Sequence, residues 1–145
     1  MNGKNGKILL VEDEEADVEL ITSSRRKHNL SNEINVARDG EEALDYLYRR
    51  GAFEQLQGED PVLVLLDLKM PKLGGIEVLK TMKSDKKLKN IPVVIVTSSR
   101  ENPDIQKCYE LGVNAYVVKP IDFTEFTEAI KNVGLFWLLI NQPPI

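Results

Sequence analysis

The sequence alternates between short, almost wholly apolar runs and longer segments with helical patterning. Apolar residues on consecutive positions fit strands of a parallel sheet that helices cover on both faces. Each run is also too short to be a core helix. Alternating strands and helices are typical of an α/β fold, so five β/α units are expected. The five runs are Ile8 to Val11, Ile34 to Ala37, Val62 to Leu66, Val93 to Val96 and Ala115 to Val118.

Helix boundary signals lie between these runs. Asp39 with Glu42, and Asp122 with Glu125, have the spacing of a capping box at a helix start. The first of these helices is expected to stop before Gly51.

Another helix boundary is marked by proline and glycine. Asn102 is expected to cap a helix with Pro103 at its first position, and Gly112 is expected to end that helix.

The length of 145 residues suits one domain. We expect that domain to span 7–133, with 134–145 forming an extension of the last helix and a tail. The polar N-terminus lacks the apolar stretch of a signal peptide, and the apolar run Leu135 to Ile140 is too short to cross a bilayer. These features predict a cytoplasmic protein with no membrane partner.

Composition excludes several classes of site. One cysteine, Cys108, permits no internal disulfide, and a single histidine beside it excludes a zinc site of the His/Cys type. The formal net charge of −4 argues against nucleic acid as a direct partner, because phosphate contacts need a basic surface. Neither a P-loop nor a G-x-G-x-x-G motif is present, which argues against nucleotide binding.

Charged and hydroxyl side chains follow four of the five runs. Because ligands of an open parallel sheet bind beyond the carboxyl ends of its strands, these side chains are expected to converge on one edge. They are Glu12 and Asp13 after the first run, Asp67 after the third, Thr97 with Ser98 and Ser99 after the fourth, and Lys119 after the fifth.

This set has the chemistry of a magnesium-assisted phosphoryl acceptor. Clustered carboxylates repel one another unless a cation relieves them, and oxygen ligands select a hard cation such as Mg²⁺. A carboxylate beside that metal can act as a nucleophile toward phosphorus, giving an aspartyl phosphate. Lys119 and Thr97 are expected to neutralise and bind the phosphoryl oxygens.

Four segments of the chain resemble the signature segments of response-regulator receiver domains, in the order of that family. They are Leu10-Val11-Glu12-Asp13, Asp67-Leu68-Lys69-Met70-Pro71 with Gly75, Val96-Thr97-Ser98 and Val118-Lys119-Pro120. The resemblance covers about residues 7 to 133. It implies a flavodoxin-like, doubly wound sheet of five parallel strands in the order 2-1-3-4-5, with five helices.

The resemblance also implies a role for each acidic position. Asp67 corresponds to the phosphoacceptor. Asp13 would bind Mg²⁺ directly, together with the Asp67 carboxylate and the backbone carbonyl of Lys69, and Glu12 would act through water. Glu14, Glu15 and Asp17, by contrast, are interpreted as a solvated first helical turn.

The remaining roles concern the phosphoryl oxygens and the switch. Lys119 is expected to pair with the phosphoryl group, and its bond to Pro120 is expected to be cis. Thr97 is expected to move toward the phosphorylated aspartate, and Tyr116 has the position of the aromatic switch residue. His28 and Cys108 are interpreted as structural.

The end of the chain is apolar on more than one helix face. Leu135, Phe136, Leu138 and Leu139 lie off the stripe that faces the sheet, which favours a contact with a second copy of the chain. The alternative is that the tail 141–145 covers them. The ending Phe136-Trp137-Leu138 is similar to single-domain regulators of bacterial phytochrome systems.

The predicted function is that of a stand-alone response regulator. A sensor histidine kinase would transfer phosphate to Asp67, and an unknown downstream protein would recognise the switched face. The protein is not expected to be an enzyme, beyond promoting its own phosphorylation and dephosphorylation. The alternative is a phosphorylation-independent interaction module. A phosphatase of the haloacid dehalogenase type is disfavoured, because that class has a second aspartate where this chain has Lys69.

Overall fold

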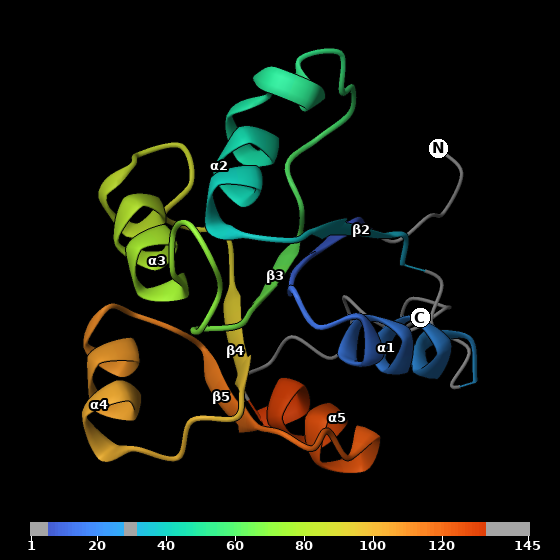
Figure 1. Cartoon of the computed structure of the whole chain (residues 1–145), viewed down its shortest axis with the longest axis vertical. Helices are drawn as coiled ribbons and strands as arrows, with labels where there is room; N and C mark the ends of the chain where they lie inside the picture. The colour runs from blue at the N-terminus through green and yellow to red at the C-terminus, as the bar shows by residue number, and fades with distance from the viewer. Residues whose placement is uncertain (1–5, 28–31, 133–145) are drawn as a thin grey trace.

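The computed structural model describes residues 6–27 and 32–132, which form a five-stranded parallel sheet (Figure 1). The order β2-β1-β3-β4-β5 is the one that the resemblance implied. Each strand lies within one residue of a predicted run. The strands are β1 (Ile8–Val11), β2 (Ile34–Ala37), β3 (Leu63–Leu66), β4 (Val93–Thr97) and β5 (Ala115–Val118).

Helices cover both faces of the sheet. Figure 1 shows α1 and α5 on one face and α2, α3 and α4 on the other. The helices are α1 (Glu15–Lys27), α2 (Gly40–Tyr48), α3 (Gly75–Ser84), α4 (Asn102–Glu110) and α5 (Phe123–Asn132), with a short 3-10 turn η1 (Gly51–Phe53) after α2. Among the described residues, none of these helices has the length and apolar content needed to span a bilayer.

The strand residues divide between two apolar cores. Because successive strand side chains point to opposite faces, Leu9 and Val11 join the core under α2, α3 and α4, whereas Ile8 and Leu10 join the other. On the second face Val18 of α1 packs in the same core. This two-sided burial explains why the strands are apolar at consecutive positions.

The start of α2 follows the predicted capping box with one shift. The Asp39 side chain accepts a hydrogen bond from the Glu42 backbone N–H at 2.8 Å. The Glu42 carboxylate accepts from the backbone N–H of Arg38, one residue before the cap, at 2.7 Å. The helix ends before Gly51 as predicted, but Arg49 takes the left-handed position, with φ 56°.

The start of α4 differs from the prediction. Asn102 is the first helical residue and Glu101 is the cap, so the helix begins one residue earlier than its Asn-Pro pair suggested. Proline is accepted at either of the first two helical positions, because those N–H groups have no partner within the helix. Gly112 lies just past the end of α4 with φ +97°, as predicted.

Two glycines allow loops to approach closely at the carboxyl edge of the sheet. A Cβ on Gly75 would overlap the carbonyl oxygen of Asp67 and the Cα of Leu68. A Cβ on Gly40 would overlap the carbonyl oxygen of Leu73, which accepts a hydrogen bond from the Gly40 N–H at 3.1 Å. The loop that follows Asp67 is therefore held between α2 and α3.

Candidate phosphoacceptor and metal site

Two of the acidic positions, Glu12 and Asp67, are fixed by backbone hydrogen bonds of the sheet. The backbone N–H of Asp67, just after β3, donates to the carbonyl of Val11 at the end of β1 at 3.1 Å. The backbone N–H of Glu12 donates to Ala37 at the end of β2 at 2.9 Å. The ladder thus extends one residue beyond the strands and brings Glu12 and Asp67 to one edge.

Lys119 follows β5, which lies two strands away from β3, and it reaches the same edge of the sheet. The Lys119 backbone N–H donates to the Thr97 carbonyl at 2.8 Å, which continues the pairing of β4 with β5. The bond between Lys119 and Pro120 is cis, as the resemblance implied.

Lys119 lies among three carboxylates. Its ammonium nitrogen is 2.8 Å from a carboxylate oxygen of Glu12, 2.8 Å from one of Asp17 and 3.3 Å from one of Asp67. The interpretation of Asp17 as a solvated first-turn acid is therefore wrong. The long lysine side chain reaches from β5 to the first turn of α1, where Asp17 pairs with it.

The two carboxylate oxygens of Asp67 have different partners. Oδ1 accepts from the backbone N–H of Leu68 at 2.7 Å and from that of Lys69 at 3.4 Å. Oδ2 accepts from Lys119. The side chain is buried, so these contacts fix its orientation at the end of β3.

Three carboxylates lie close together, and the sequence predicted such a cluster as a metal site. Ligand oxygens of Glu12, Asp13 and Asp67 all lie within 4.8 Å of one another. Carboxylate oxygens without histidine or cysteine suit a hard divalent cation, so the donor set fits Mg²⁺ or Mn²⁺.

The pKa values reflect this crowding. Burial, helped by the negative charge of Asp67, raises the pKa of Glu12 to about 7 against the hydrogen bond from Lys119. Burial opposes the charged form of Lys119, but its contacts with Asp17, Glu12 and Asp67 outweigh burial and raise its pKa. The lysine is therefore a fixed positive charge, while burial favours the protonated form of Glu12.

Thr97 of β4 and Tyr116 of β5 both contact Ser99 in the β4–α4 loop. Thr97 is fully buried, and its hydroxyl accepts from the Ser99 N–H at 3.5 Å, with no hydrogen bond to Asp67 or Lys119 among the described contacts. The Tyr116 hydroxyl donates to the Ser99 carbonyl at 3.0 Å. The Ser99 hydroxyl donates to Asp104 of α4 at 2.5 Å. Ser99 thus joins the two predicted switch residues to a helix.

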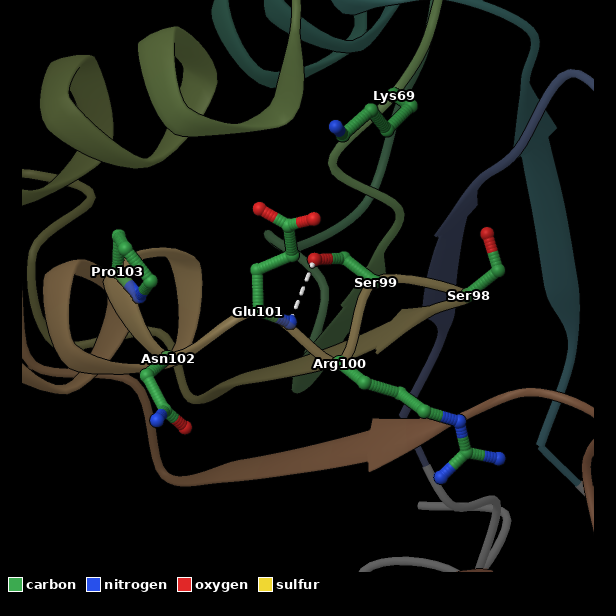
Figure 2. Close-up of a pocket in the computed structure, with 7 residues that line it drawn as sticks. All are labelled: Lys69, Ser98, Ser99, Arg100, Glu101, Asn102 and Pro103. Atoms are coloured by element: carbon green, nitrogen blue, oxygen red, sulfur yellow. Dashed lines mark hydrogen bonds between the residues drawn. The ribbon is translucent and has the colours of Figure 1, made fainter.

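An open hollow of about 640 Å³ adjoins the site between the β3–α3 and β4–α4 loops (Figure 2). Figure 2 shows the Glu101 carboxylate directed toward the side where Lys69 lies. The other lining residues are Ser98, Ser99, Arg100, Asn102 and Pro103. The hollow gives an outside molecule access to this edge of the sheet.

Several predicted residues fall elsewhere. Leu135, Phe136, Leu138 and Leu139 lie outside the described residues, as does His28. Cys108 is buried in α4, and burial raises the pKa of its thiol to about 11, in keeping with the structural role predicted for it.

Sequence reasoning missed the contacts of Asp17 and Ser99. The signal for Asp17 was its place in the first turn of α1, directly after β1, at the same sheet edge as Glu12. In the sequence, Ser99 is only one of the hydroxyl residues that follow the fourth run. Nothing in the pattern distinguished its bridge to α4.

The chain matches the family model of the response regulator receiver domain over residues 8–131. It is 37% identical to response regulator Rcp1 of Synechocystis over 131 residues, covering 90% of this chain and 88% of Rcp1.

Solved structures of similar proteins share the fold. The bacteriophytochrome response regulator AtBRR has a TM-score of 0.85 and 52% identity, covering 96% of this chain and 99% of that one. The phosphorylated cyanobacterial phytochrome response regulator RcpA has a TM-score of 0.78 and 40% identity, covering 92% and 94%. An Mn²⁺-bound form of Rcp1 has a TM-score of 0.78 and 36% identity, covering 97% and 99%.

Proposed function

This chain belongs to the family of response regulator receiver domains, and from that premise we propose that it accepts its phosphoryl group on Asp67. It is a phosphorylation-accepting regulator of the Rcp1 and RcpA type. The observation that supports Asp67 most strongly is that its two carboxylate oxygens have different hydrogen-bond partners. One oxygen is held by backbone N–H groups and the other faces Lys119 within the cluster of acids.

The metal of the reaction is Mg²⁺ in this proposal. Asp13 and Asp67 would hold it directly with the backbone carbonyl of Lys69, and Glu12 would contribute through water. The acidic donor set supports this, as does the Mn²⁺-bound form of the similar protein Rcp1. When bound, the cation neutralises the charge that develops on the phosphoryl oxygens.

The chemical step is an in-line displacement at phosphorus. An oxygen of Asp67 forms the new P–O bond while the P–N bond of a phosphohistidine donor breaks, and the released imidazole nitrogen takes up a proton from solvent. The Lys119 ammonium is within reach of oxygens on Asp67, so it can donate to a phosphoryl oxygen there. Thr97 donates its hydroxyl to another phosphoryl oxygen once it leaves its contact with Ser99.

The switch runs through the β4–α4 loop. Thr97 and Tyr116 both contact Ser99, so a shift of Thr97 changes the position of a residue that Tyr116 and α4 also hold. The face formed by α4, β5 and α5 is then the surface that a downstream protein reads.

The partner that delivers phosphate is a sensor histidine kinase, and the similar proteins AtBRR and RcpA indicate one of the phytochrome type. The protein works in the cytoplasm and associates with a second copy of itself. Its only catalytic activity is on its own acceptor group, which it helps to phosphorylate and dephosphorylate.

The test is intact mass after incubation with acetyl phosphate. Wild type is expected to gain one phosphoryl group only when Mg²⁺ is present, and Asp67→Asn is expected to gain none. Asp60→Asn, an acid outside the site, is the matched control and should behave as wild type. If wild type gains nothing with Mg²⁺ and also fails to bind beryllofluoride, the proposal is wrong.

A further inference from the structure

The first turn of α1 contributes an acid that the acceptor chemistry does not itself require. Asp17 lies two residues into α1 and contacts Lys119, which is 102 residues away in the chain. The distance between the Asp17 carboxylate and the Lys119 ammonium is 2.8 Å, equal to that between Glu12 and Lys119.

Asp17 differs from the other two acids around Lys119. Glu12 and Asp67 both belong to the group whose oxygens lie within 4.8 Å of one another, whereas Asp17 does not. The Asp17 side chain is 25% exposed, against 1% for Glu12 and 6% for Asp67. Asp17 can therefore hold Lys119 without taking part in metal binding.

The ammonium group has three N–H donors and three carboxylate neighbours. Glu12 and Asp17 make the two shorter contacts, at 2.8 Å each, which leaves the third donor for Asp67 at the longer distance of 3.3 Å. Without Asp17, a flexible four-carbon side chain would have one short anchor instead of two.

We propose that Asp17 is a positioning residue, which holds the Lys119 ammonium so that its remaining donor faces the Oδ2 oxygen of Asp67. This inference rests on the proposed function, because it assigns Asp17 a part in phosphorylation of Asp67. Asp17 does not touch the phosphoryl group. It acts through Lys119 by fixing the lysine before the donor arrives.

If Asp17 positions Lys119, removing Asp17 should change the phosphorylation rate in the opposite direction from the loss of a negative charge alone. Removing any acid near the site makes the local field less negative, which favours approach of an anionic phosphodonor and speeds the reaction slightly. Removing the anchor of Lys119 slows the reaction, because the lysine then has to be ordered during the chemical step.

The experiment compares Asp17→Asn with Glu19→Gln in phosphorylation by acetyl phosphate at saturating Mg²⁺. Glu19 lies on the same helix, is exposed, and has no described side-chain contact with Lys119, so its variant matches the change in charge. Asp17→Asn is expected to react about tenfold more slowly than wild type. Glu19→Gln is expected to react at the wild-type rate or slightly faster, and Asp17→Glu to recover part of the loss.

A second readout does not depend on phosphorylation. The Lys119 ammonium is expected to give a slowly exchanging signal in nitrogen-15 NMR, identified by its loss in Lys119→Arg. Its hydrogen exchange should be several-fold faster in Asp17→Asn and unchanged in Glu19→Gln, with Mg²⁺ affinity within twofold of wild type in both. These values would support positioning, because a general loss of stability would not affect the exchange of the Lys119 ammonium alone.

The outcomes are distinct. If wild type is phosphorylated but Asp17→Asn matches Glu19→Gln in rate and in lysine exchange, the positioning role is wrong and the proposed function stands. If Asp17→Asn fails to fold by circular dichroism, Asp17→Glu decides through the same two measurements. If wild type accepts no phosphoryl group, the proposed function fails and the role of Asp17 fails with it.

Discussion

At the carboxyl edge of the sheet, a residue can be required for its size and not for any reactive group. Gly75 has no catalytic group, yet only its missing side chain allows α3 to begin against the carbonyl of Asp67. Its N–H donates to the Leu68 carbonyl at 3.0 Å, which holds the loop that follows Asp67 against that helix. The position of Asp67 therefore depends on a glycine eight residues later.

Gly75→Ala should lower the free energy of unfolding by roughly 2 kcal/mol, because the added methyl group forces the backbone of Asp67 or Leu68 to move. Phosphorylation by acetyl phosphate should slow in parallel. The matched control is Gly74→Ala, whose Cβ would lie 3.3 Å from the Leu68 carbonyl oxygen at an ordinary φ of −78°. Urea denaturation measures both. Equal losses in the two variants would contradict the overlap argument.

At the scale of elements, boundary signals in the sequence predicted most of the secondary structure. Strand ends agreed within one residue because two-sided burial leaves continuous apolar runs. The start of α4 was missed by one residue, since Asn102 and Glu101 can both precede a helical proline. Local patterns identify a helix better than its first residue, because adjacent positions compete for the same cap.

The Asp39 cap of α2 offers a test at this scale. Asp39→Ala should lower the free energy of unfolding by about 1 kcal/mol, because the Glu42 N–H loses its acceptor. Asp39→Asn keeps a capping oxygen and should lower the free energy of unfolding by only a few tenths of a kcal/mol, although it removes the ion pair with the exposed Lys72. Thermal and urea unfolding compare the two. If the Asn variant is as unstable as the Ala variant, charge rather than capping is the cause.

At the scale of the whole molecule, the family resemblance implied the sheet order, and the positions of Glu12, Asp13, Asp67 and Lys119 after the apolar runs predicted their meeting at one edge. Parallel strands bring their carboxyl ends to one edge, so residues that follow strands are neighbours wherever they lie in the chain. Asp17 was missed because its partner depends on the reach of one lysine side chain across the sheet. Such a contact depends on side-chain geometry, which neither periodicity nor spacing encodes.

Association of two copies is the remaining prediction at this scale. Replacing Phe136 and Leu139 together by serine should convert a dimer into a monomer in light scattering, with the circular dichroism spectrum unchanged. Leu20→Ser, which removes an exposed apolar side chain from α1, is the control and should leave the mass unchanged. A wild type that is monomeric at high concentration would show that the chain does not pair through this segment.

The site joins residues that are far apart in the sequence, which has a consequence during synthesis of the chain. Glu12 leaves the ribosome well before Lys119, and the sheet edge that joins them needs β5 beside β4. A nascent chain that has emerged only as far as α4 carries its acceptor aspartate without its lysine. The proposed acceptor site is therefore complete only after the fifth strand has docked, and a chain that lacks β5 also lacks the contact between Lys119 and Asp67.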